Sequence, residues 1–411
     1  MHIAEFLLAL IAIFLAAKGC GEIAERLGQP AVLGELVGGI VVGVSGLQLV
    51  DPHDITIHLL SELGVILLLF VIGLETDLKR LVSVGGSAAA VAIVGVILPF
   101  AGGFLFGRFL GLSTVVAIFI GASMTATSVG ISARVLSDLG HLQDRESQVI
   151  LGAAVLDDII GLILLTLVGT IAIGGELTPL GIGRVTLVAF GFVLLAIVIG
   201  SRLAPFLIRM INKAKMQRAL LFSAVVFAFF LAWLAQEAGS AMIIGSFAAG
   251  LVLAQTNGRQ EILPQVHDVA QFFIPIFFVA VGAAINLRSI NPFDPDSRRF
   301  LLIGLGLTAI GIAGKVAAGF AASGKNLNRT VIGVGMVPRG EVGLIFAQIG
   351  LSRKLISSGL YSAVALMVIL TTLITPLLLR MLLVRRAATP FTGHASEFVN
   401  LAPQDREQSS D

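Results

Sequence analysis

The sequence predicts an all-α polytopic membrane protein with about thirteen transmembrane helices. Hydrophobic residues make up 56% of the 411 residues and charged residues only 13%, a composition outside the range of soluble globular domains. Apolar runs close to the roughly 20 residues that cross a bilayer recur along the chain. Cys20 is the only cysteine. The composition therefore excludes a soluble domain, a nucleic-acid-binding protein and a secreted disulfide-rich fold.

Charges, prolines and glycine clusters divide the apolar sequence into thirteen predicted helices. The first, 2–19, has no basic segment before it, so we interpret it as a retained helix and not as a signal peptide. The others cover residues 30–46, 55–75, 85–110, 113–136, 147–174, 181–209, 216–236, 239–256, 263–285, 299–321, 327–350 and 358–385. We expect residues 387–411 to form a short polar tail.

Lysine and arginine residues predict the orientation of the chain. If the N-terminus lies outside, seventeen of these residues fall in cytoplasmic segments and seven in outer segments. Short cytoplasmic loops carry an excess of Lys and Arg. We therefore expect the N-terminus outside and the C-terminus in the cytoplasm, in the cell (inner) membrane.

Two short internal similarities predict an inverted repeat. Residues 34–43 resemble residues 245–254 at an offset of 211, and residues 73–78 resemble residues 282–287 at an offset of 209. Seven predicted helices separate the partners, so the second copy would be inserted upside down, as in many secondary transporters. The two predicted copies and the linker helix cover about residues 1–174, 216–386 and 181–209, respectively.

Two adjacent aspartates interrupt the sixth predicted helix. Asp157 and Asp158 lie about eleven residues into it, near the middle of the membrane at 1.5 Å per residue. A carboxylate at that depth costs about 2.5–3.5 kcal/mol on insertion scales and usually faces a partner or a water-filled cavity. Burial and mutual repulsion favour protonation of at least one of them. We interpret the pair as an exchange site, and the alternative is a buried ion pair without a role in transport.

Two later helices carry charges that could neutralise these carboxylates. Lys315, inside the eleventh predicted helix, is the natural counter-ion for one of them, because an unpaired buried ammonium tends to lose its proton. Arg339 and Glu341 follow Pro338 in the twelfth. We therefore expect this helix to be broken near the midplane and its two charges to pair locally.

The fifth predicted helix is interrupted at the corresponding position. Residues 125–128 read Thr-Ala-Thr-Ser, and adding 209 to Thr125 gives Val334, just before the Gly335–Pro338 segment. Broken helices expose helix ends and carbonyl groups that can hold a cation. Thr127 and Ser128 either coordinate a cation directly or bond back to their own backbone.

Four other polar residues give weaker predictions. Glu35 and Glu75 fit solvation at the membrane interface better than packing or gating. His141 and His267 lie near helix ends, where a role in pH response is an alternative to simple interfacial positions. The histidines show no metal-ligand spacing.

Three segments together resemble the monovalent cation:proton antiporter-2 family, specifically its NapA-type sodium/proton members. They are Met124-Thr-Ala-Thr-Ser-Val-Gly-Ile-Ser-Ala-Arg134, Gly152-Ala-Ala-Val-Leu-Asp-Asp-Ile-Ile-Gly161 and Gly335-Met-Val-Pro-Arg-Gly-Glu-Val-Gly343. The likeness covers residues 1–386. It implies an NhaA/NapA-like fold with two broken crossing helices. It also implies a homodimer in which a dimer domain and a core domain, interleaved in sequence, move like an elevator.

The resemblance also implies roles for individual residues. Asp158 would be the carboxylate that binds the monovalent cation, and Asp157 would be the partner of Lys315. The neighbours of the site would be Thr127, Ser128 and Glu341, with Thr125, Pro338 and Arg339 in supporting positions.

A secondary active sodium/proton antiporter is the function we expect, exchanging Na⁺ (or Li⁺) for H⁺ by alternating access. Both ions would compete for the same carboxylates, and the exchange would be electrogenic. The expected partners are the lipid bilayer, small monovalent cations, protons and a second copy of the chain. We expect no nucleic acid, cofactor or enzymatic activity.

Other functions stay open as alternatives. Kef-type potassium-efflux relatives usually carry a soluble nucleotide-binding domain and a Gln-Asp pair, so the Asp-Asp pair and short tail favour Na⁺ over K⁺. A gated cation channel would need a continuous pore. An intramembrane aspartyl protease needs carboxylates from two helices that share a proton, whereas these two lie on one helix about 100° apart.

Overall fold

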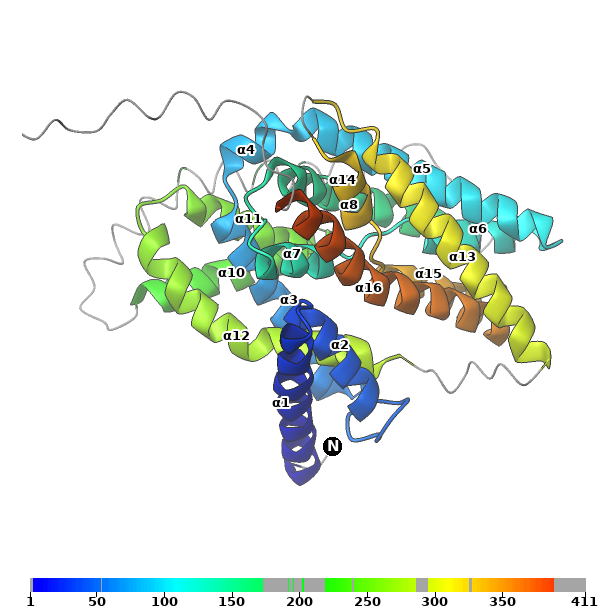
Figure 1. The fold of residues 1–411 in the computed structure, drawn as a ribbon, viewed down its shortest axis with the longest axis horizontal. Coiled ribbons are helices and arrows are strands. Elements are labelled where there is room, and N and C mark those ends of the chain that lie inside the picture. Colours follow the sequence, from blue (N-terminus) through cyan, green and yellow to red (C-terminus); the bar gives the residue numbers. More distant parts are fainter. Residues whose placement is uncertain are drawn as a thin grey trace, which may run out of the picture.

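The structure is a computed structural model, and every regular element in its described residues is a helix (Figure 1). It describes residues 3–52, 54–172, 219–238, 240–285, 295–324 and 327–387, together with the single residues 191, 195 and 202. The helices pack as two bundles, which α4 joins at residues Leu78–Ser83.

The first bundle holds the beginning of each predicted repeat. Its helices are α1 (Ile3–Arg26), α2 (Ala31–Val42), α3 (Ile55–Glu75), α10 (Ala219–Glu237), α11 (Met242–Ala254) and α12 (Arg259–Ala283). Among the closest packings are α3 against both α11 and α12, α1 against α2, and α2 against α12. Helices far apart in sequence thus lie side by side.

The second bundle holds the rest of each repeat and occupies the upper right of Figure 1. Its helices are α5 (Gly85–Phe109), α6 (Thr114–Ser123), α7 (Val129–Asp138), α8 (Arg145–Ala172), α13 (Pro295–Gly319), α14 (Arg329–Gly335), α15 (Glu341–Ser352) and α16 (Ser358–Ala387). In this bundle α5 packs against α6, α8 and α13, and α13 packs against α14 and α16.

Long apolar helices confirm the expectation of a polytopic membrane protein. Eight helices within the described residues are long and apolar enough to cross a membrane, and four shorter apolar helices accompany them. Twelve of the predicted spans coincide with described helices, two of which are broken. The remaining span, 181–209, falls outside the described residues except at the single residues named above. The total of thirteen therefore stays a prediction.

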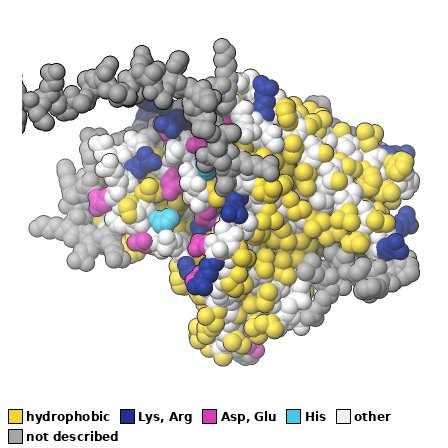
Figure 2. All heavy atoms as spheres, in the orientation of Figure 1, with side chains coloured by type: hydrophobic (Ala, Val, Ile, Leu, Met, Phe, Trp, Pro, Cys, Tyr) yellow, Lys and Arg dark blue, Asp and Glu magenta, His cyan; other side chains and the backbone are white. Residues whose placement is uncertain are grey.

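Hydrophobic side chains cover a broad part of the surface (Figure 2). On α1, Leu7, Leu8, Ile11 and Leu15 are all more than half exposed. A lipid-facing helix buries its outer residues in acyl chains and not in protein, which explains these exposed side chains.

Two glycine pairs bring helices of the first bundle into backbone contact. A Cβ on Gly39 of α2 would lie 2.8 Å from the Cα of Gly282 in α12, and a Cβ on Gly73 of α3 would lie 2.9 Å from the Cα of Gly250 in α11. Only glycine allows these close approaches. By the offsets found in the sequence, Gly39 corresponds to Gly250 and Gly73 to Gly282. Each of the two contacts is therefore the counterpart of the other.

Both predicted helix interruptions are present. Residues 124–128 separate α6 from α7, and residues 336–340 separate α14 from α15. A hydrogen bond joins the two non-helical segments directly, since the Ser128 N–H donates to the Pro338 carbonyl over 2.8 Å. The segments cross at this point.

Candidate functional site

The crossing leaves helix-end carbonyl groups that need donors. The last carbonyls of a helix have no intrahelical partner. The Thr127 hydroxyl donates to the Met336 carbonyl over 3.2 Å. This hydrogen bond lies beside the one from the Ser128 N–H to the Pro338 carbonyl. Residues 127 and 128 are thus held by the other broken helix.

Arg339 supplies hydrogen bonds in the opposite direction, from the second broken helix to the first. Its fully buried guanidinium donates through Nη1 to the carbonyls of Thr125 and Ala126, over 2.7 and 2.9 Å. A cation at the C-terminal end of α6 also complements the negative end of that helix dipole. Thr372 of α16 fixes the arginine backbone by donating its hydroxyl to the Arg339 carbonyl over 2.6 Å.

Asp157 and Lys315 form a buried ion pair between α8 and α13. Lys315 Nζ lies 3.2 Å from Asp157 Oδ2, and both side chains are 0% exposed. The charge argument anticipates a contact of Lys315 with one of the two carboxylates, and the family resemblance implies Asp157. Arg339 also interacts electrostatically with Asp157. Within the described part of the chain, Asp157 Oδ1 and the Nε and Nη2 atoms of Arg339 have no hydrogen-bond partner.

Asp158 faces a different environment from its neighbour. Its side chain, 9% exposed, lies at the wall of a cavity of about 20 Å³. That volume holds about one water molecule or a small ion. The wall combines polar residues of the second bundle with apolar residues of the first, among them Thr127, Ser128, Gly340, Val65, Ile243 and Phe277.

Two half-helices begin at this cavity. The wall includes Val129, the first residue of α7, and Val342, the second residue of α15. The N-terminal end of a helix carries a partial positive charge, which stabilises a nearby anion. A carboxylate at position 158 is therefore compatible with this site even before a cation arrives.

Among the predicted site residues whose side chains the structure describes, Asp158, Thr127 and Ser128 line the cavity, whereas Asp157, Lys315, Pro338, Arg339 and Thr125 do not. Thr125 turns its hydroxyl back to the Ala122 carbonyl, over 2.8 Å. Glu341 begins α15, but its side chain falls outside the described atoms. The predicted pairing of Glu341 with Arg339 is therefore not tested.

The burial of Glu35 differs from what the sequence predicts. We expected interfacial solvation, but the side chain is only 6% exposed. The reason is that α2 packs against α7, where Arg134 and Asp138 form an ion pair of 3.0 Å that interacts with Glu35. Residue hydropathy does not reveal this contact between distant helices.

Sequence reasoning missed two hydroxyl groups that support the crossing. Thr372 holds Arg339, and Ser132 of α7 donates to the Gly335 carbonyl. A signal for the first was present, because threonines at 371, 372 and 375 interrupt an otherwise apolar helix. No such signal marked Ser132.

Two crossing broken helices, a buried carboxylate pair and a small cavity between two bundles define a membrane transporter of small cations. A family model described as "Sodium/hydrogen exchanger, transmembrane" matches residues 7–385. The chain belongs to this family of monovalent cation:proton antiporters, which are transporters and not enzymes. The expected resemblance is thereby confirmed.

Individual relatives match over most of their length. The chain is 43% identical to the high-affinity Na⁺/H⁺ antiporter NhaS3 of Synechocystis sp., covering 92% of this chain and 90% of that protein. It is 38% identical to the Na⁺/H⁺-K⁺ antiporter GerN of Bacillus cereus, covering 92% and 96%. Its fold is similar to that of the sodium proton antiporter MjNhaP1 of Methanocaldococcus jannaschii, with a TM-score of 0.71 at 19% identity, over 94% and 97% of the two chains.

Proposed function

We propose that the protein exchanges Na⁺ for H⁺ by alternating access, with Asp158 as the carboxylate that both ions share. The observation that carries the proposal is the position of Asp158 at the wall of a cavity that fits one small ion. Asp157 beside it is already paired with Lys315. Of the two adjacent carboxylates, Asp158 is the one that lines this cavity.

Competition between the two ions explains the coupling. A deprotonated Asp158 attracts a monovalent cation, and the Thr127 and Ser128 oxygens at the same wall are suitable hard ligands. Protonation removes the charge and releases the cation. Each ion can therefore bind only after the other has left, and the gradient of one drives the other.

Reciprocal contacts support an inverted-repeat architecture for this exchange. The glycine pairs Gly39–Gly282 and Gly73–Gly250 correspond to each other, and both repeats contain a broken helix. We assign residues 1–386 to the transport domain, with helix 181–209 as a linker and 387–411 as a cytoplasmic tail. The first bundle would be the dimer domain of a homodimer, and the second would be the moving core. The N-terminus would lie outside the cell membrane.

Potassium is the second candidate cation. The relative GerN is named for both Na⁺ and K⁺, and carboxylate and hydroxyl oxygens accept any hard monovalent cation. Li⁺ fits the same chemistry. The Asp-Asp pair favours Na⁺ in our proposal, because the potassium-efflux relatives described above carry a Gln-Asp pair.

Everted vesicles loaded by respiration provide the test. Addition of Na⁺ should release protons from vesicles that contain the protein and not from control vesicles, and Li⁺ and K⁺ added in turn give the selectivity. Proton release with K⁺ but not with Na⁺ would show that K⁺ is the exchanged cation and would overturn the choice of Na⁺. Absence of release with all three cations would refute cation/proton exchange.

Exchange should also be electrogenic. If more than one proton is exchanged for each cation, net charge crosses the membrane, and one charge is worth about 2.3 kcal/mol per 100 mV. Proteoliposomes clamped with a potassium diffusion potential should therefore show voltage-dependent Na⁺-driven pH changes. A rate and an end point indifferent to voltage would mean one-for-one exchange.

A further inference from the structure

A second cavity lies away from the ion site, between the two bundles. It has a volume of about 190 Å³. Its walls are α4, α5 and α8 on one side and α11 on the other, and they include Leu78, Leu81, Val155, Leu156, Phe247 and Leu251. Every lining residue is apolar or glycine. An ion, a nucleotide or a sugar would therefore find no polar partner there.

The size and position of this cavity suit a hydrocarbon chain. An apolar cavity of about 150 Å³ already admits benzene. Val82, at the wall of the cavity, is 70% exposed, so the cavity reaches the surface of the protein. The helix that carries Val82 connects the end of α3 to the start of α5 and therefore lies at one face of the membrane.

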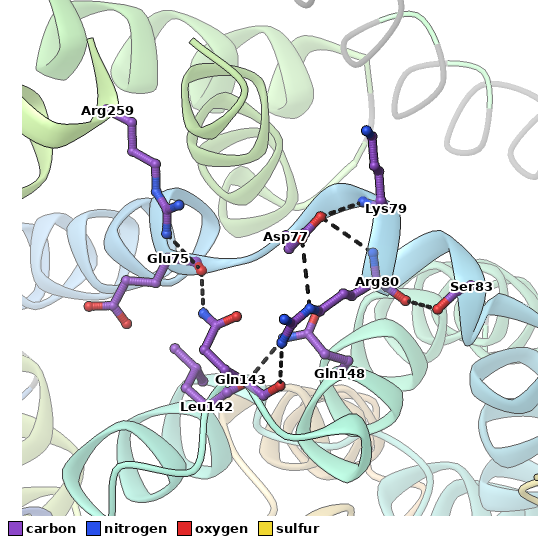
Figure 3. A network of polar contacts seen from close by, with 9 residues as sticks. All are labelled: Glu75, Asp77, Lys79, Arg80, Ser83, Leu142, Gln143, Gln148 and Arg259. Atoms are coloured by element: carbon purple, nitrogen blue, oxygen red, sulfur yellow. Dashed lines mark hydrogen bonds and ion pairs between the residues drawn. The ribbon is translucent and has the colours of Figure 1, made fainter. Parts of the chain in front are cut away.

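Two basic residues lie on α4, close in sequence to the exposed wall residue Val82. Lys79 and Arg80 belong to the same short helix as the lining residues of α4, and both are exposed. Figure 3 shows the Lys79 side chain pointing away from the neighbouring polar network. Among the described residues its ammonium has no ion pair, and the only ion pair of Arg80 is a 3.8 Å contact with Asp77. Two exposed cations beside an apolar cavity are complementary to a lipid with an anionic headgroup.

The surrounding network holds α4 in place and engages Arg80, while Lys79 is left without an ion pair among the described residues. Asp77 caps α4 by accepting from the Lys79 and Arg80 backbone N–H groups, and Arg80 Nη1 donates to the Gln143 carbonyl over 3.4 Å (Figure 3). Arg259 of α12 donates to the Glu75 carbonyl over 3.2 Å. Arg80 thus ties α4 to the segment before α8, and Arg259 holds the end of α3 from which α4 follows.

We propose that this cavity binds part of one acyl chain of an anionic phospholipid, the rest of which lies in the bilayer and whose phosphate contacts Lys79 and Arg80. The lipid would lie between α8 and α11, and therefore between the two bundles. This site is separate from the cavity of Asp158, and the proposal does not depend on which cation is transported.

Thermal unfolding of the purified full-length protein in detergent tests the proposal. Phosphatidylglycerol should raise the unfolding midpoint more than phosphatidylcholine with the same acyl chains, because a ligand that binds only the folded state stabilises it. Glycerophosphoglycerol, which lacks acyl chains, should give no shift. Equal shifts with both phospholipids, or an equal shift with the free headgroup, would overturn the proposal.

Variants locate the effect. The double substitution Lys79→Gln/Arg80→Gln should remove more than half of the increment due to phosphatidylglycerol, and Ala248→Phe, which fills the cavity, should do the same. If Ala248→Phe does not fold, Val82→Trp, which blocks the entrance without altering the core, should remove the increment to the same extent. The matched control is Arg26→Gln, an exposed residue at the end of α1 on the same membrane side, which should keep the full increment. A full increment in the Lys79/Arg80 variant would contradict the assignment.

Discussion

The two broken helices cross in similar ways but with different side chains. In the α6–α7 segment, neutral threonine and serine hydroxyls donate to carbonyls of the other helix. In the α14–α15 segment, the buried guanidinium of Arg339 donates to the Thr125 and Ala126 carbonyls. Both solutions satisfy helix ends inside the membrane, but only one of them adds a charge.

The same division extends to the helices around the crossing. By the repeat offset of 209, Asp157 corresponds to Leu366, and Lys315 corresponds to Phe106. The first half thus supplies the acidic pair, and the second half supplies Lys315 and Arg339, the buried cations among the described residues. A similar scaffold with unequal charges allows one binding site where strict symmetry would give two. The following predictions test this division.

The largest loss of stability should follow from breaking the ion pair between the two halves. Lys315→Ala alone or Asp157→Asn alone disturbs a buried pair from one side, which typically costs about 3–5 kcal/mol when a charge is left uncompensated. The double variant should lose much less than the sum. A double-mutant cycle in thermal melts measures this coupling, and additive losses would argue against a direct contact.

A smaller loss should follow from Arg339→Lys. Lysine keeps the positive charge but cannot hold two carbonyls with the geometry of a guanidinium. Because a buried carbonyl without its donor costs about 1–3 kcal/mol, we expect a destabilisation in that range. The matched control is the exposed Arg353, whose substitution by lysine should change stability by less than about 0.5 kcal/mol. Equal behaviour of the two variants would show that the charge alone matters.

The smallest expected effect distinguishes Thr127 from Thr125, both in the segment between α6 and α7. Thr127→Val and Thr125→Val each remove one hydroxyl bond, worth about 0.5–1.5 kcal/mol. Only Thr127 lines the cavity of Asp158. We therefore expect a higher KM for the cation in Thr127→Val and an unchanged KM in Thr125→Val. Parallel KM changes in both would remove Thr127 from the ion site.

Most helices could be predicted because the bilayer imposes a length and an apolar composition on each. The prediction of 55–75 equals the bounds of α3. The ends of α1 and α2 were less accurate. The first continues to Arg26 because polar residues are tolerated beyond the hydrocarbon core, and the second stops at Val42 because Gly43 follows. The helix at 78–83 was missed, since six residues leave no periodic signal.

The site could be predicted in composition but not in its connections. Adjacent aspartates inside a membrane helix can be recognised from the sequence alone. The helix turns by about 100° per residue, so their two side chains point in different directions. Which of them meets Lys315 depends on the rotation of α8, so only the family resemblance assigned Asp157. The bonds from Arg339 to Thr125 and Ala126 join residues more than 200 positions apart, and local spacing contains no information about them.

The most direct test of the central assignment is Na⁺-driven proton movement in proteoliposomes that contain the Asp158→Asn variant. An amide has nearly the same shape as the carboxylate but cannot alternate between a proton and a cation. We predict that exchange is abolished while the unfolding midpoint stays close to that of the unmodified protein, and that Asp144→Asn, outside the site, keeps its exchange. Near-normal exchange by folded Asp158→Asn protein would contradict the account.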